Sequence, residues 1–202
     1  MRSLTNVRIL APADEVEAAQ AIRAMMAADG PFYLQVTREA SPVLFDSDHR
    51  FQIGRGVRLC EGGDVSLVST GPQTTRVFEA SEILSRRGIQ ATVLHLPTIK
   101  PIDELALVEA ARATGLVVVV EEQNVLGGLG GAVAEVLSKR HPVSVIRLGI
   151  RDAYGESGPN PALLDKHRLS ASKIAEDVHA LVTRRTPRTP WITRLSGLDK
   201  VG

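Results

Sequence analysis

One stretch, from Gly115 to Leu137, limits what this chain can fold into more than any other: GLVVVVEEQNVLGGLGGAVAEVL. The apolar run from Leu116 to Val120 has no polar interruption, which is typical of a strand buried on both faces of a parallel sheet. A loop with four glycines follows, and apolar residues then recur at helical spacing from Ala132. The stretch is therefore predicted to form a strand, a glycine loop and a helix.

The glycine loop leads into a helix whose first N–H groups have no partner inside the helix, so it could hold an anion or a neighbouring backbone. It matches a dinucleotide fingerprint poorly. Read from Gly128, the pattern places Val133 where a glycine or alanine belongs, and the acidic pair Glu121 and Glu122 precedes the loop instead of following it. Packing within the chain, or contact with a partner chain, is the favoured interpretation.

The two glutamates themselves allow two interpretations. They could form a site pair at the end of a buried strand. Alternatively, they include a buried carboxylate that accepts hydrogen bonds from the backbone N–H groups of the glycine loop. This second interpretation is favoured.

Strands and helices are expected to alternate along the chain, which predicts an α/β fold: a mostly parallel sheet with helices on both faces. Beyond the opening stretch, strands are expected at 6–10, 32–36, 65–69, 91–96 and 143–148. Helices are expected at 15–28, 74–87, 102–114 and 171–181, with a further helical segment at 163–164. Asp14 and Ser170 are the expected N-caps. Residues 40–63 and 97–101 are broken by proline, glycine or aspartate and are expected to be a linker and a loop.

The first forty residues form one strand–helix–strand unit, which buries too little apolar surface to be stable alone. We therefore expect this unit to pack against something else. The composition changes after residue 183, where prolines and arginines accumulate, and an extended tail is expected at 184–202.

Composition excludes several classes of function. The formal net charge of +1 gives no bulk electrostatic case for nucleic acid or membrane binding. No apolar run approaches the length of a membrane span and the amino terminus does not resemble a signal peptide, so a cytoplasmic location is expected. The five histidines show no metal or nucleophile spacing, and each is expected to be structural or solvated: His49, His95, His141, His167 and His179.

Five segments together resemble the carboxyl-terminal part of the transketolase family, most closely the small subunit of split transketolases and the equivalent region of deoxyxylulose-phosphate synthase. They are RSLTNVRILAPADEVEA, GPFYLQVTR, LPTIKPIDE, VEEQNVLGGLGGAVAEVL and GIRDAYGESGPNPALLDKHRLSASKI, in this order. One departure is Gln123, where the family often has histidine.

The resemblance implies that 1–40 is the last strand–helix–strand of a pyrimidine-binding domain and that 41–183 is a transketolase C-terminal domain. It also implies thiamine diphosphate and Mg²⁺, held mainly by a partner chain that carries the diphosphate-binding domain and the rest of the pyrimidine-binding domain. The metal-binding motif G-D-G…N of that domain is not in this sequence, and Gly62-Gly63-Asp64 does not match it. A truncated coding sequence is the alternative explanation.

The function that the resemblance implies is the C-terminal component of a multi-chain, thiamine-diphosphate-dependent, transketolase-like enzyme. Such an enzyme transfers a two-carbon ketol unit, and the component would be inactive alone and part of a hetero-oligomer. One alternative is a subunit of an enzyme related to pyruvate dehydrogenase, which passes the unit to a carrier-protein or lipoyl thiol. Another is a non-catalytic docking or regulatory subunit.

One family site maps onto this chain. Transketolases bind a sugar phosphate through an arginine that ends a strand reading LSR, and Arg38 in LQVTR occupies that position. A guanidinium group presents a planar fork of donors to phosphate oxygens. The alternative is an ordinary surface ion pair. The tail from Thr186 is expected to dock on a partner through Trp191, Ile192 and Leu195, and a disordered terminus is the alternative.

Overall fold

The structure is a computed structural model that describes residues 1–184. Its main feature is a five-stranded sheet with the order β3-β5-β4-β7-β8, in which β4 is parallel to β5 and β7, and β7 is parallel to β8. The strands are β3 (Val57–Cys60), β4 (Val65–Ser69), β5 (Ala91–His95), β7 (Leu116–Asn124) and β8 (Ser144–Ile150). The predicted, mostly parallel sheet is confirmed.

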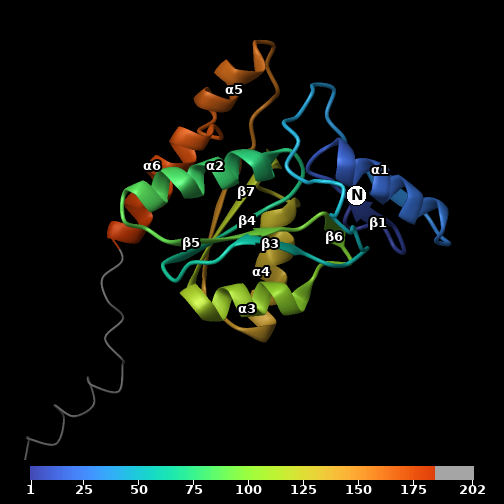
Figure 1. Cartoon of the computed structure of the whole chain (residues 1–202), viewed down its shortest axis with the longest axis horizontal. Coiled ribbons are helices and arrows are strands. Elements are labelled where there is room, and N and C mark those ends of the chain that lie inside the picture. The colour runs from blue at the N-terminus through green and yellow to red at the C-terminus, as the bar shows by residue number, and fades with distance from the viewer. Residues whose placement is uncertain (185–202) are drawn as a thin grey trace, which may run out of the picture.

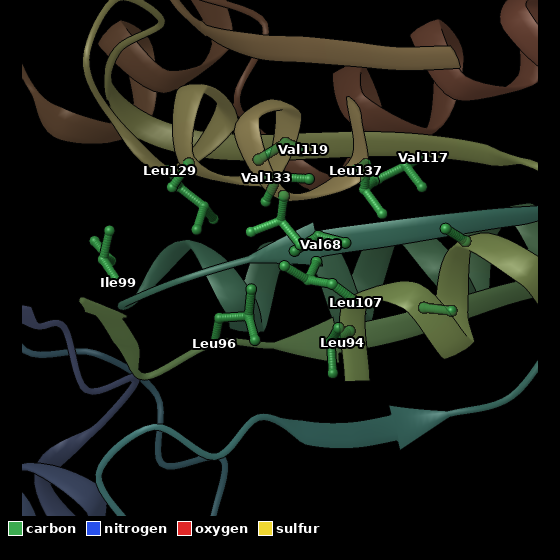
Figure 2. Packing of buried hydrophobic residues seen from close by; sticks show 14 of the residues in the cluster. Val68, Leu94, Leu96, Ile99, Leu107, Val117, Val119, Leu129, Val133 and Leu137 are labelled. Atoms are coloured by element: carbon green, nitrogen blue, oxygen red, sulfur yellow. The ribbon is translucent and has the colours of Figure 1, made fainter. Parts of the chain in front are cut away.

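Helices cover both faces of this sheet (Figure 1). Helices α2 (Gln73–Arg86) and α6 (Ala171–Thr183) lie on one face, and α3 (Glu104–Thr114) and α4 (Leu129–Arg140) lie on the other. The side chains of strand β7 point alternately to these two faces. Leu116, Val118 and Val120 pack with α2 and α6, whereas Val117 and Val119 pack with α3 and α4 (Figure 2). The apolar run in the sequence is therefore a strand buried on both faces.

A second, smaller sheet has three strands in the order β2-β1-β6. Strand β1 (Arg8–Leu10) is parallel to β2 (Phe32–Leu34), and α1 (Glu15–Met26) connects them. Strand β6 (Thr98–Lys100) pairs with β1 in the antiparallel direction. This sheet therefore joins the first forty residues to a segment much further along the chain.

Two predicted irregular segments contain strands. The expected loop at 97–101 contains β6, and the expected linker at 40–63 contains β3, which is an antiparallel edge strand beside β5. Both predictions are wrong at these residues. Each strand is short, and proline or glycine lies close to it. Its pairing partner is distant in sequence, so local composition does not reveal it.

The two predicted N-caps differ in outcome. Asp14 caps α1: one carboxylate oxygen accepts a hydrogen bond from the backbone N–H of Glu17 at 2.9 Å. Ser170 lies at the N-cap position of α6, but its hydroxyl group donates to Asp165 at 2.7 Å and does not cap the helix. The helical segment predicted at 163–164 is α5 (Asn160–Lys166). Within residues 1–184, no helix is both long and apolar enough to cross a membrane.

Candidate functional site

The glycine loop before α4 holds a carboxylate of this same chain. Glu121 is 1% exposed, and its two carboxylate oxygens accept hydrogen bonds from the backbone N–H groups of Leu129 at 2.7 Å and Gly130 at 2.9 Å. These are N–H groups of the first turn of α4, where an anion is favoured. The buried-carboxylate interpretation is therefore confirmed, and so is packing within the chain as the use of the loop.

The glycines are needed because Glu121 lies so close to the loop. A Cβ atom at Gly128 would lie 1.8 Å from a carboxylate oxygen of Glu121, and one at Gly130 would lie 2.7 Å from the side chain of Arg147. Gly127 has a φ of +80°, which side chains rarely adopt. Glu121 thus occupies the N–H groups of Leu129 and Gly130, which an anion at the start of α4 would otherwise bind.

Burial raises the pKa of the Glu121 carboxyl above its ordinary value, against the opposing effect of the N–H groups of Gly130 and Leu129 and the charges of Arg147 and Arg2. Glu122, its neighbour in sequence, binds a different partner, since it forms an ion pair with Arg76 of α2. The two glutamates therefore have separate structural roles.

Arg2 closes the outer side of the same loop. Its guanidinium group donates to the carbonyl oxygen of Gly127 at 3.2 Å and to both carboxylate oxygens of Glu135 at 2.7 and 3.0 Å. The hydrogen bond from Arg2 lowers the pKa of the Glu135 carboxyl. The amino-terminal segment is thereby attached to α4.

A second polar cluster lies where α1 meets the five-stranded sheet, and it is buried except at His49, which is partly buried. One carboxylate oxygen of Glu17 lies 2.8 Å from Nε2 of His95 and the other lies 3.2 Å from Nε2 of His49, and both Glu17 and His95 are 0% exposed. The N–H of Ala13 also donates to Glu17, at 2.7 Å. The ring of Phe45 stacks on that of His49, with the centroids 3.8 Å apart.

Hydroxyl groups extend this cluster to α2 and β4. Ser69 donates to the Thr74 hydroxyl oxygen at 3.0 Å, and that oxygen lies 2.7 Å from Nδ1 of His95. Because Thr74 accepts from Ser69, its own proton is directed to Nδ1, so Nε2 carries the ring proton and donates to Glu17. The order hydroxyl–imidazole–carboxylate resembles a nucleophilic triad, but these side chains are enclosed in the core. We assign the cluster a structural role, as expected for His49 and His95.

Sequence reasoning missed this cluster, because its members come from four distant segments. One signal was available. Glu17 and Ala21 are the buried residues of α1, four positions apart on one helix face, so Glu17 occupies a core-facing position. A carboxylate there requires buried donors, and histidines are suitable ones.

Arg38 is exposed in the bend that follows β2, at the carboxyl end of that strand. A hollow of about 200 Å³ lies beside this segment, and its lining includes Asp14, Glu15, Thr37 and Glu39. Three of these residues are acidic, so the hollow itself does not favour a phosphate. An oxyanion bound by Arg38 would therefore lie outside the hollow, toward whatever covers this face.

The described residues, 1–184, offer neither a metal-ligand cluster nor an open phosphate site that would fit thiamine diphosphate and Mg²⁺. Within 1–184, no group of three His, Cys, Asp or Glu side chains is arranged to hold a metal ion. Two N–H groups at the start of α4 that could bind a phosphate, those of Leu129 and Gly130, donate to Glu121. No step of a reaction is therefore assigned to the cofactor on this chain.

The chain thus combines a five-stranded α/β domain, covered by helices on both faces, with a three-stranded sheet that includes the strand–helix–strand unit of the first forty residues. Residues 54–174 match the family described as the transketolase C-terminal domain. The chain belongs to the transketolase family.

Individual relatives agree with this assignment. The chain is 36% identical over 188 residues, 93% of its length, to the 6-deoxy-6-sulfo-D-fructose transketolase subunit SqwH of Clostridium sp. (strain MSTE9), and covers 58% of that protein. It is 32% identical over 178 residues, 87% of its length, to an apulose-4-phosphate transketolase subunit of Actinobacillus succinogenes, and covers 57% of it.

A solved structure described as a split gene transketolase, inactive beta4 tetramer, superposes with a TM-score of 0.85 at 39% identity, covering 92% of this chain and 60% of that one. The chain thus spans somewhat more than half the length of the relatives that it matches.

Proposed function

We propose that this chain is the C-terminal component of a multi-chain, thiamine-diphosphate-dependent transketolase, and that it is inactive without a partner. The observation that carries the proposal is the combination of a complete transketolase C-terminal domain with two parallel strands and a helix from a second, incomplete sheet. Two strands and one helix bury too little apolar surface to be stable alone, and under this proposal a partner chain would supply the further strands of that sheet. The partner would also carry the diphosphate-binding domain.

The substrates proposed are sugars that end in an oxyanion. Two relatives are subunits of transketolases whose names specify a sulfonated sugar and a sugar phosphate. Arg38, exposed at the carboxyl end of β2, is suited to bind either group, because a guanidinium pairs with tetrahedral oxyanions through two parallel N–H bonds.

This proposal gives the two chains different roles in ketol transfer. Thiamine diphosphate, when bound to the partner, would supply the carbanion chemistry of ketol transfer. This chain would position one end of the sugar through Arg38. The buried cluster around Glu17 and His95 attaches α1 to β5 and α2 of the C-terminal domain. Strand β2, which precedes Arg38, pairs with β1.

Purification with a partner tests the proposal. The full-length chain, tagged at one end, is expressed in its native host, and chains that co-purify in stoichiometric amount are identified by mass spectrometry. We expect a chain that contains the G-D-G…N motif, and we expect the complex to consume a phosphorylated ketose only when thiamine diphosphate and Mg²⁺ are present. Release of a two-carbon unit onto a carrier-protein thiol would support the pyruvate dehydrogenase-like alternative. A stoichiometric complex without either activity would contradict the proposal.

A further inference from the structure

A hollow of about 340 Å³ lies between the first turns of α2, the starts of α5 and α6, and the segment 39–42; we call it the α2/α5 hollow. Its volume is at the lower end of the range of small-molecule sites, roughly 300–1,000 Å³. On the side of α2 it is lined by Pro72, Thr75, Arg76 and Glu79. These positions are three or four residues apart, so one face of α2 points into the hollow.

Thr75 lies at the floor of this hollow with an unpaired hydroxyl group. It is 8% exposed, whereas every other residue that lines the hollow is half-buried or exposed. Within residues 1–184, its Oγ1 is the one buried side-chain oxygen or nitrogen atom without a hydrogen-bond partner. An unpaired buried hydroxyl group costs free energy of folding, so this position favours a bound molecule that can pair with it.

Two helix starts add backbone donors to the same hollow. Helix α2 begins after Pro72 and α6 begins after Ser170, and both of these residues line the hollow. Neither helix has a side-chain cap or an acidic residue in its first turn. Since the first N–H groups of a helix have no partner inside the helix, they favour an acceptor atom at these two places.

The charged side chains of the hollow disfavour an anion as that acceptor. Two carboxylates line it, those of Glu39 and Glu79, against the single guanidinium group of Arg76, which already forms an ion pair with Glu122. Glu39 also accepts a hydrogen bond from the side-chain amide of Asn160 at 2.7 Å. The hollow therefore offers both kinds of partner: carboxylates that accept, and guanidinium, amide and helix N–H groups that donate.

We propose that the α2/α5 hollow binds a small, uncharged, polyhydroxylated molecule, a sugar or a polyol. Each hydroxyl group of such a molecule can donate and accept, which matches the mixed set of groups and the unpaired hydroxyl of Thr75. A phosphate ion would meet two carboxylates, and an ammonium ion could not use the helix N–H groups. Every residue that lines the hollow lies within 39–171, so the inference does not depend on the proposed function.

NMR titration of the full-length chain tests the proposal, with xylitol as the probe. We expect saturable shifts of amide signals at the hollow, among them those of Thr75, Arg76 and Ala171, with a dissociation constant on the order of millimolar. Inorganic phosphate is the second probe. Shifts at these residues with phosphate but not with xylitol would assign an anion site and overturn the proposal. No saturable shift with either would mean that water alone pairs with Thr75, and would overturn it as well.

Thr75→Val separates ligand binding from folding. Valine has a similar shape and lacks the unpaired hydroxyl, so the melting temperature should stay unchanged or rise, while xylitol binding should weaken about tenfold. Thr74→Val is the matched control. The Thr74 hydroxyl is bonded to Ser69 and His95, so its loss should lower the melting temperature by about 3 °C or more. Equal destabilisation by both variants, or full xylitol affinity in Thr75→Val, would overturn the proposal.

A second pair of variants tests the carboxylates without disturbing the core. Glu79 and Glu82 are both exposed on α2, but only Glu79 lines the hollow. Glu79→Ala removes an acceptor for a hydroxyl group and should weaken xylitol binding about threefold to tenfold. Glu82→Ala should leave the dissociation constant unchanged. Tighter binding of phosphate and unchanged binding of xylitol in Glu79→Ala would show that the carboxylate only repels anions, and would contradict a site for a polyol.

Discussion

Glu121 shows how one side chain can decide between two functions for a sequence motif. A glycine loop before a helix can bind phosphate or can accept a carboxylate from its own chain. The carboxylate of Glu121 occupies the N–H groups of Leu129 and Gly130, so the loop serves to join β7 to α4. The poor match of the sequence to a dinucleotide fingerprint already favoured this result.

Substitution of the glycines is expected to reveal this tight packing. Gly128→Ala places a Cβ 1.8 Å from an oxygen of Glu121, so the carboxylate must move and leave buried N–H groups without a partner, at a cost of about 3 kcal/mol or more. Gly127→Ala meets no atom within 4 Å but strains a φ of +80°, for about 1–2 kcal/mol. Gly155→Ala, with neither constraint, is the control. Urea unfolding measures the loss of free energy of unfolding for all three variants. Equal losses for Gly128→Ala and Gly155→Ala would contradict the close packing of Glu121 against the loop.

The pH dependence of stability should carry the signature of Glu121. Since burial raises its pKa, the folded chain binds this proton more tightly than the unfolded chain does. Its contribution to the free energy of unfolding is therefore complete below the ordinary value of 4.5 and is lost as the pH rises through the raised value. The free energy of unfolding of the wild type, minus that of Glu121→Gln, should therefore decrease from pH 4 to pH 7, because only the wild type loses this contribution.

Glu135 provides a control of opposite sign. Its hydrogen bond with Arg2 lowers its pKa, so its contribution is present above the ordinary value and is lost as the pH falls. The difference between the wild type and Glu135→Gln should therefore widen slightly from acid to neutral pH; the change should be small because the side chain is largely exposed. If the wild-type-minus-variant free energies of unfolding changed with pH in the same direction for both variants, the raised pKa of Glu121 would be refuted.

Arg38 is expected to recognise the oxyanion of the sugar in the assembled enzyme. A charge-assisted hydrogen bond contributes about 1.5–3 kcal/mol, so Arg38→Ala should lower kcat/KM about tenfold to a hundredfold with a phosphorylated substrate. With a substrate that has no oxyanion, Arg38→Ala should change kcat/KM little. Arg50→Ala, in the segment before β3, is a matched arginine control. Equal losses with both substrates would mean that Arg38 acts through folding or assembly.

At the scale of the elements, the predictable parts were those with local signals. The strand at 65–69 agrees with β4 at every residue, and Asp14 caps α1 as its position before an amphipathic helix indicated. The missed strands β3 and β6 are short edge or connecting strands that form through distant partners. The partners of Glu17 in the buried cluster were missed for the same reason, because only the tertiary fold brings His49 and His95 together.

This cluster should make the attachment of α1 to the C-terminal domain depend on one carboxylate. Glu17→Ala leaves the N–H of Ala13 and the Nε2–H of His95 buried without an acceptor, and should destabilise the fold by about 3–5 kcal/mol. Glu15→Ala, on the exposed face of the same helix, should change stability by about 0.5 kcal/mol or less. Denaturant unfolding with both variants is the measurement. A similar, small loss for each would show that the cluster does not fix α1.

At the scale of the whole molecule, the described residues form a five-stranded sheet and a three-stranded sheet. The five-stranded sheet has a buried core on each face, while the three-stranded sheet leaves β2 uncovered at its edge. The domain limits at 40 and 183 stay a prediction, and the tail from Thr186 lies outside the described residues. Strand β6 follows β5 of the five-stranded sheet in the chain and pairs with β1, so it links the three-stranded sheet to the C-terminal domain.

The final prediction concerns what the polypeptide of 202 residues does alone. Because its own carboxylate fills the one phosphate-like loop that the sequence offers, and because no metal-ligating group of three is formed within 1–184, the pure chain should show no thiamine diphosphate binding. Calorimetry with the cofactor and Mg²⁺ is the measurement. The same titration of the complex with its partner should give a saturable heat, which serves as the positive control. Micromolar binding by the pure chain would contradict the proposal that a partner chain holds the cofactor.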